Sequence, residues 1–98
     1  MSETDAAQNP TRAIVGICNQ RGLHARASAK FVKLASVYEA EVKVTRDGVT
    51  VDARSIMGLL MLGAGNGCDV TIEAEGPDAA EAVAALAELV QRRFDEDQ

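Results

Sequence analysis

The stretch Glu41–Asp52 reads EVKVTRDGVTVD, and it decides the fold because it predicts two antiparallel strands joined by a tight turn. Apolar and polar residues alternate on both sides of Asp47-Gly48, as in half-buried strands. Aspartate and glycine tolerate the positive φ angles of a two-residue type I′ turn. The residues predicted to face the core are Val42, Val44, Val49 and Val51.

Two further segments, residues 11–18 and 70–74, show the same alternation and predict the remaining strands. Gly76-Pro77 ends the later one, because proline cannot donate to a strand ladder. Their inward residues are predicted to be Ala13, Val15, Ile17, Val70, Ile72 and Ala74.

Three segments have the spacing of amphipathic helices. The first two are predicted over Ala25–Val37 and Ile56–Leu62, with Ser55 as the N-cap of the second. The third begins at Asp78, which resembles the start of a capping box, and its apolar stripe extends to Phe94.

The predicted order is β-α-β-β-α-β-α, which indicates one α+β domain over residues 11–95. Because the strands alternate rather than being apolar throughout, we expect an open-faced sandwich: a four-stranded antiparallel sheet with three helices on one face. Residues 1–10 are predicted to be a disordered N-terminal tail. The acidic end, residues 95–98, is expected to fray into solvent.

Composition excludes several classes of function. The net charge of −5 and a pI near 4.7 argue against nucleic-acid binding, which needs a broad basic surface. No apolar run is long enough for a membrane span, and the acidic start lacks the pattern of a signal peptide. Cys18 and Cys68 are far apart and read as buried or half-buried thiols. We therefore expect a cytoplasmic protein that acts as a monomer.

The only histidine, His24, is the candidate reactive residue. It lies where a loop gives way to the first helix, and helix N-termini offer free N–H groups to anions. Residues 11–38 contain basic side chains but no acidic one. Arg26 can present a guanidinium to phosphate oxygens, and Gly22 leaves the backbone free to turn sharply. These features predict an imidazole that accepts a phosphoryl group and hands it on.

The same residues are also compatible with less specific interpretations. A histidine near an arginine is by itself weak evidence for phosphoryl transfer. His24 is equally compatible with a residue that ends a helix and takes part in no reaction. One histidine and two distant cysteines do not make a metal site. A hydrolase triad is not expected either, because no second histidine is available as the base for a serine or cysteine. The cluster Gly63–Gly67 lacks the Lys-Ser/Thr of a phosphate loop and precedes a strand. No metal or cofactor is expected.

Two motifs in this order and spacing, Gly22-Leu23-His24-Ala25-Arg26 and Arg54-Ser55-Ile56-Met57-Gly58-Leu59-Leu60, carry a family resemblance. From about Ala13 to Phe94 the chain closely resembles the HPr family, the histidine phosphocarriers of the bacterial phosphoenolpyruvate-dependent phosphotransferase system. The family fold matches the order predicted above.

The resemblance implies that enzyme I phosphorylates His24 on Nδ1 and that His24 passes the group to an enzyme IIA-type acceptor. Arg26 matches the arginine that helps hold the phosphoryl group. Ser55 matches a serine that a dedicated serine kinase, opposed by a phosphorylase, modifies in some branches. A partly exposed apolar surface for docking enzyme I and acceptors corresponds to Ile56, Met57 and Leu60.

The short second helix has a competing structural interpretation. Ser55 serves well as an N-cap without any kinase. Helical spacing favours an inward stripe of Ile56, Leu59 and Gly63, and it leaves exposed Met57, Leu60 and Met61.

One position departs from the family pattern: Ala27 follows Arg26 where proline is usual. Alanine restores an N–H that proline lacks and loosens the entry to the helix. The run around Cys18–Arg21 and Ala27–Ala29 resembles members of nitrogen-related or regulatory branches. Two hypotheses follow: a phosphoryl carrier, or a regulatory binding module whose docking is switched by phosphorylation of His24 or Ser55.

Overall fold

The computed structural model describes residues 11–97, and their elements follow the predicted order. The predicted tail over residues 1–10 lies outside the described residues. The elements are β1 (Thr11–Gly16), α2 (Ala25–Ala35), β2 (Glu41–Arg46), β3 (Val49–Asp52), α3 (Ile56–Met61), β4 (Asp69–Glu75), α4 (Ala79–Gln91) and the 3₁₀ turn η1 (Arg93–Asp95).

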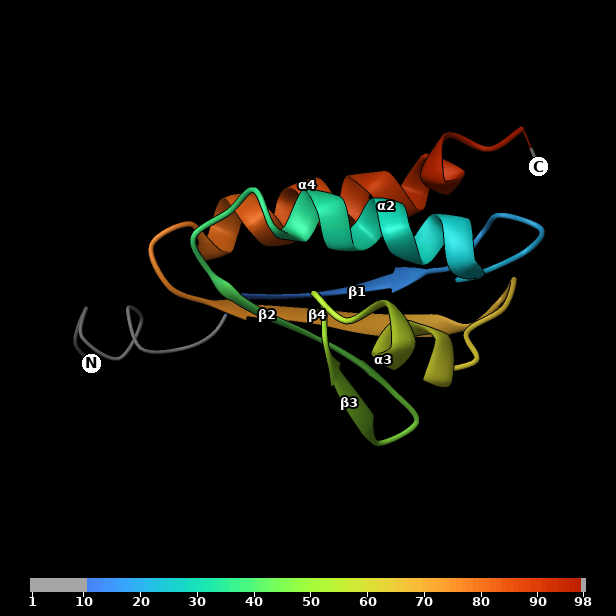
Figure 1. The fold of residues 1–98 in the computed structure, drawn as a ribbon, viewed down its shortest axis with the longest axis horizontal. Helices are drawn as coiled ribbons and strands as arrows, with labels where there is room; N and C mark the ends of the chain where they lie inside the picture. Colours follow the sequence, from blue (N-terminus) through green and yellow to red (C-terminus); the bar gives the residue numbers. More distant parts are fainter. Residues whose placement is uncertain (1–10, 98) are drawn as a thin grey trace.

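The strands form one antiparallel sheet in the order β1-β4-β2-β3, with the helices on one of its faces (Figure 1). The β2–β3 connection is the predicted hairpin: φ is 51° at Asp47 and 80° at Gly48, the positive values of a type I′ turn. The predicted α+β open-faced sandwich is confirmed.

The core lies between the sheet and the helices, and it is built from the alternating strand residues. Val42 and Val44 face inward from β2, and Ile72 lies opposite Val44 on β4. Phe31 of α2 and Leu86 of α4 cover this layer and are fully buried. Burial of such side chains contributes roughly 1.5–3 kcal/mol each, so this layer fixes how the helices sit on the sheet.

Four local predictions were wrong. Helix α2 ends at Ala35, so Val37 lies beyond it and is exposed. Val49, at the start of the edge strand, is also exposed rather than inward. Asp78 does not cap α4 with its side chain; instead Oδ2 accepts the backbone N–H of Glu39 at 2.8 Å. This bond links the β4–α4 connection to the α2–β2 connection. Cys18, expected to be at least half-buried, is exposed.

The end of the chain differs most from prediction. Helix α4 stops at Gln91, and Arg93, Phe94 and Asp95 have φ angles of 61°, 54° and 61°. Non-glycine residues rarely adopt this left-handed conformation. Phe94 is fully buried, and its packing holds this left-handed turn in place. The residues after α4 therefore form a separate turn instead of extending the helix.

Within residues 11–97, no helix combines the length and the apolar character needed to cross a membrane.

Candidate functional site

His24 occupies the predicted position at the start of α2, where it is the N-cap residue. Its carbonyl accepts the first helical bond, from Ser28 N–H at 2.8 Å. The N–H groups of the intervening residues, 25–27, therefore have no acceptor within the helix. The imidazole is 18% exposed, so it is partly shielded but accessible to a partner.

The loop that carries His24 is fixed against the glycine-rich connection between α3 and β4. Leu23 N–H donates to the Ala64 carbonyl at 2.9 Å. Gly22 has φ +66°, and a Cβ there would lie 2.5 Å from the Ala64 carbonyl oxygen and 2.7 Å from Gly65 Cα. Only glycine allows this approach. The Gly63–Gly67 cluster was predicted only as a turn. In the structure it also packs against the loop that carries His24.

The imidazole contacts a carboxylate from the end of the chain. His24 Nε2 lies 2.5 Å from Oε2 of Glu96. Asn19 Nδ2 donates to Oε1 of the same carboxylate and to the Gly22 carbonyl, both at 2.9 Å. Each oxygen of the Glu96 carboxylate therefore has one partner, and Asn19, one of the two partners, is fully buried. The expectation that residues 95–98 fray is wrong for Glu96, whose side chain is only 14% exposed.

The pKa of Glu96 reflects this surrounding. Burial raises the pKa of the carboxyl, but hydrogen bonds from Asn19 and His24 and the nearby charge of Lys30 outweigh it and lower the pKa overall. A lowered folded-state pKa means that the ionised carboxylate stabilises the fold above the unfolded pKa. That contribution is lost as the pH falls through the folded pKa. At neutral pH Glu96 is therefore a carboxylate beside His24.

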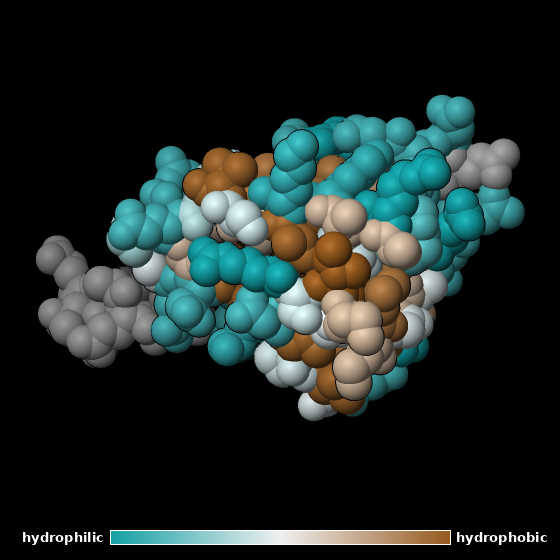
Figure 2. All heavy atoms as spheres, viewed as in Figure 1, coloured by the Kyte–Doolittle hydropathy of each residue, from teal (hydrophilic) through white to brown (hydrophobic). Residues whose placement is uncertain are grey.

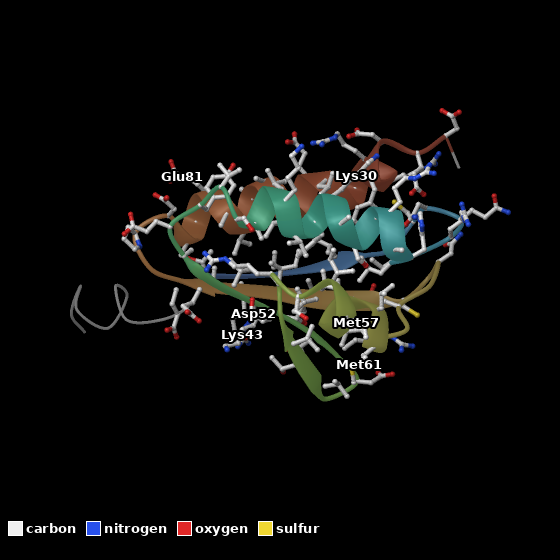
Figure 3. All side chains as sticks on the ribbon, in the orientation of Figure 1. Lys30, Lys43, Asp52, Met57, Met61 and Glu81 are labelled. Atoms are coloured by element: carbon white, nitrogen blue, oxygen red, sulfur yellow. The ribbon has the colours of Figure 1, made fainter. Side chains whose placement is uncertain are left out.

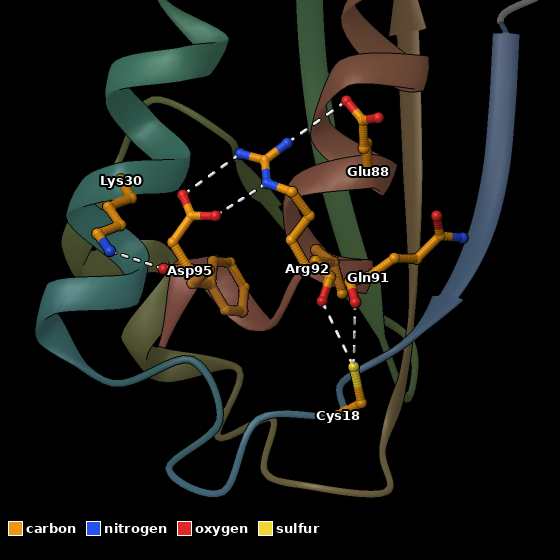
Figure 4. Close-up of polar contacts among 8 residues, drawn as sticks. Cys18, Lys30, Glu88, Gln91, Arg92 and Asp95 are labelled. Carbon is orange, nitrogen blue, oxygen red and sulfur yellow. Dashed lines mark hydrogen bonds and ion pairs between the residues drawn. The ribbon is translucent and has the colours of Figure 1, made fainter. Parts of the chain in front are cut away.

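Figure 4 shows how the segment before Glu96 is anchored. Lys30 Nζ donates to the Phe94 carbonyl at 2.6 Å, which links α2 to η1. Arg92 Nε donates to Asp95 Oδ1 at 3.0 Å, and this hydrogen bond lowers the pKa of Asp95. Cys18 contributes a weak thiol contact to the Val90 carbonyl at 3.6 Å. These contacts place Glu96 in one position relative to α2.

Charged side chains of both signs surround an open depression of about 420 Å³, which is lined by Glu96, the residue in contact with His24. The loop and α2 provide its cations, among them the predicted phosphate-holding Arg26, which is exposed. The end of the chain provides its acids. The lining residues are Gln20, Arg21, Arg26, Lys30, Asp95, Glu96 and Asp97. The structure therefore brings Arg26 to the same depression as Glu96.

The second predicted motif forms α3 and its cap. Ser55 Oγ accepts the Gly58 N–H at 2.9 Å, so its predicted role as N-cap is confirmed. Leu59 and Leu62 point inward, whereas Ile56, predicted to join the inward stripe, is 40% exposed. The predicted inward stripe is therefore wrong for Ile56 and also for Gly63, which is exposed, and the inward residues of this segment are Leu59 and Leu62.

A continuous apolar surface covers α3. Figure 2 shows it as a group of apolar side chains over α3 and β3, and Figure 3 shows Met57 and Met61 on the side of α3 away from α4. Exposed methionines adapt readily to different partners. We call this the α3 surface, and its exposed residues are Ile56, Met57, Leu60 and Met61.

Sequence reasoning missed Asn19 and Glu96. Asn19 lies in a predicted loop, and no local pattern distinguishes a buried asparagine from an exposed one. For Glu96 the only sequence signal was Phe94, an aromatic residue among charged ones near the chain end. Within residues 11–97, no group of three or more His, Cys, Asp or Glu side chains is arranged to hold a metal ion.

Comparison with known proteins shows the family to which this chain belongs. A family model described as the PTS HPr component phosphorylation site matches residues 11–92. The chain belongs to the HPr family. It is 54% identical over 80 residues to the phosphocarrier protein HPr of Cupriavidus necator, covering 82% of this chain and 90% of that protein.

Other HPr relatives agree in sequence and in structure. The phosphocarrier protein NPr of Shewanella violacea is 44% identical over 82 residues, covering 84% of this chain and 90% of that protein. The crystal structure of HPr-C-His from Thermoanaerobacter tengcongensis superposes with a TM-score of 0.86 at 40% identity, covering 90% of this chain and 99% of that one. The HPr family consists of phosphocarrier proteins of the phosphotransferase system, and this chain has their fold.

Proposed function

We propose that this chain accepts a phosphoryl group on His24 Nδ1 from enzyme I, itself charged by phosphoenolpyruvate, and passes it to an enzyme IIA-type acceptor. One observation carries the proposal: the only histidine of an HPr-family chain lies, partly exposed, at the N-terminus of α2. Nε2 faces Glu96, which leaves Nδ1 as the ring nitrogen without that partner.

The proposed step is a phosphoryl exchange between nitrogen and the donor. The lone pair on Nδ1 forms a bond to phosphorus while the bond from phosphorus to the donor atom of enzyme I breaks, and the donor keeps that electron pair. The incoming group brings negative charge. The free N–H groups that begin α2, together with the Arg26 guanidinium, stabilise this charge. In the transfer to the acceptor, an acceptor atom forms a bond to phosphorus while the Nδ1–phosphorus bond breaks, and Nδ1 regains its lone pair.

A labelling and chase experiment tests the proposal. Incubation with enzyme I and radiolabelled phosphoenolpyruvate should give an acid-labile label, as a phosphorus–nitrogen bond does, and adding an enzyme IIA protein should remove it from the chain. No label at all would contradict the proposal. Label that no acceptor removes would favour the second candidate, a regulatory binding module switched by phosphorylation, which the exposed α3 surface supports.

Arg26→Ala is expected to lower the rate of phosphorylation about 10- to 100-fold, since it removes a charge-assisted contact worth roughly 1.5–3 kcal/mol. Arg26 is exposed, so the melting temperature should not change measurably. Initial rates with enzyme I and thermal melts give both values. Lys33→Ala is the matched control, because it removes a positive charge from the last turn of the same helix. Equal loss in both variants would contradict a specific role for Arg26.

We further propose that enzyme I and acceptors dock on the α3 surface and that phosphorylation of Ser55 opposes docking. Ser55→Asp should therefore slow phosphorylation of His24, because it places a charge beside Ile56 and Met57. Aspartate is also a good N-cap, so the fold should persist. Ser55→Asn, a neutral N-cap, is the control. A Ser55→Asp rate equal to that of Ser55→Asn would contradict the docking proposal.

A further inference from the structure

Among residues 11–97, a single side-chain contact joins the His24 ring to the chain end, the one with Glu96, and the phosphoryl transfer described above gives the carboxylate itself no role. The two residues are 72 positions apart in sequence, and the carboxylate approaches Nε2 rather than Nδ1. A neutral imidazole carries one proton, on one nitrogen or the other. The nitrogen that attacks phosphorus must be the one without it.

The direction of the hydrogen bonds around Glu96 is settled by its neighbours. Asn19 Nδ2 faces two acceptors, Glu96 Oε1 and the Gly22 carbonyl, so the amide cannot be reversed without setting oxygen against oxygen. Asn19 Oδ1 consequently remains buried without a partner among the described residues. An ionised carboxylate can only accept, so Nε2 must donate.

We propose that Glu96 is a positioning residue: its carboxylate accepts the Nε2–H of His24 and thereby keeps the lone pair on Nδ1, the nitrogen that takes the phosphoryl group. This inference rests on the proposed function. Asn19 holds Glu96 in turn. When Nδ1 bonds to phosphorus, both ring nitrogens are substituted and the ring gains positive charge. The carboxylate on Nε2–H offsets that charge, as an orienting carboxylate does beside a catalytic histidine.

Several contacts in the preceding residues hold Glu96 in its position. Phe94 is buried two residues before it, Lys30 holds the Phe94 carbonyl, and Arg92 holds Asp95. Asp97, next along the chain, is exposed. It carries the same charge and lines the same depression, so it is a matched control for any general effect of acidity.

The test uses the full-length chain and two readouts. Nitrogen-15 NMR of the unphosphorylated protein at neutral pH should show His24 protonated at Nε2 and bare at Nδ1. In Glu96→Ala the two ring shifts should move toward each other as both proton positions become populated. The initial rate of phosphorylation by enzyme I should fall about tenfold, the size of effect seen when an orienting partner of a histidine is removed. Asp97→Ala should match the wild type in both readouts.

Two results would overturn the inference. One is an unchanged ring spectrum in Glu96→Ala. The other is an equal loss of rate in Glu96→Ala and Asp97→Ala, which would indicate charge alone. The readouts also separate this inference from the proposed function: if wild-type protein takes no label, the carrier role fails, while the ring spectrum still reports whether Glu96 fixes the proton.

Discussion

His24→Ala is expected to abolish labelling from phosphoenolpyruvate, with a fall in rate of about 10⁴-fold or more, because it removes the only imidazole in the chain. The sequence holds no second histidine that could act as a base for a hydroxyl or thiol in its place. The measurement is acid-labile label per chain after incubation with enzyme I.

The fold of the same variant should survive. The His24 ring is not part of the buried core, and Asn19 still donates to Glu96 Oε1 when the ring is removed. A thermal melt close to that of the wild type would show that lost labelling reflects lost chemistry. Acid-labile label remaining on His24→Ala would place the acceptor elsewhere. Acid-stable label would instead indicate a phosphorylated hydroxyl, with Ser55 as the first residue to check.

Gly22→Ala is expected to lower the free energy of unfolding more than Gly48→Ala does. The left-handed φ of +66° costs a non-glycine residue about 1–2 kcal/mol. The new Cβ would also meet two backbone atoms, Ala64 O at 2.5 Å and Gly65 Cα at 2.7 Å, and such overpacking typically costs about 1–3 kcal/mol. Denaturant unfolding should therefore show a loss of roughly 2–5 kcal/mol.

Gly48→Ala separates the two causes. Gly48 also has a positive φ, +80°, but a Cβ there has nothing within 4 Å. It should therefore lose only the conformational part, about 1–2 kcal/mol. Equal losses in both variants would contradict the claim that the histidine loop is pressed against the Gly63–Gly67 connection. Because that contact positions Leu23 and His24, Gly22→Ala should also slow phosphorylation, whereas Gly48→Ala should not.

The elements of this fold were readable from sequence because their signals are local. Alternation in EVKVTRDGVTVD needs only neighbouring residues, and so does the positive-φ chemistry of Asp47-Gly48. Predictions failed at element ends, where packing competes with local preference. Asp78 illustrates this: a suitable capping residue instead accepts the N–H of Glu39, from a connection distant in sequence.

The position of His24, the candidate reactive residue, also followed from sequence, while its surroundings did not. His24 at the start of a helix, with Arg26 two positions on, is a local pattern. The carboxylate on its ring comes from the opposite end of the chain, after a left-handed turn that no helix propensity predicts. The burial of Phe94 and the bond from Lys30 to its carbonyl hold this segment, which local sequence preference would leave to fray.

The sequence by itself determined the order of strands and helices, the antiparallel hairpin and the single histidine at the head of α2, since periodicity, turn chemistry and capping act over a few residues. The tertiary structure alone placed a carboxylate against Nε2 of that histidine. Glu96, Asn19 and His24 meet only after the core has closed, because contacts between residues 72 and 77 positions apart leave no pattern that neighbouring residues can display.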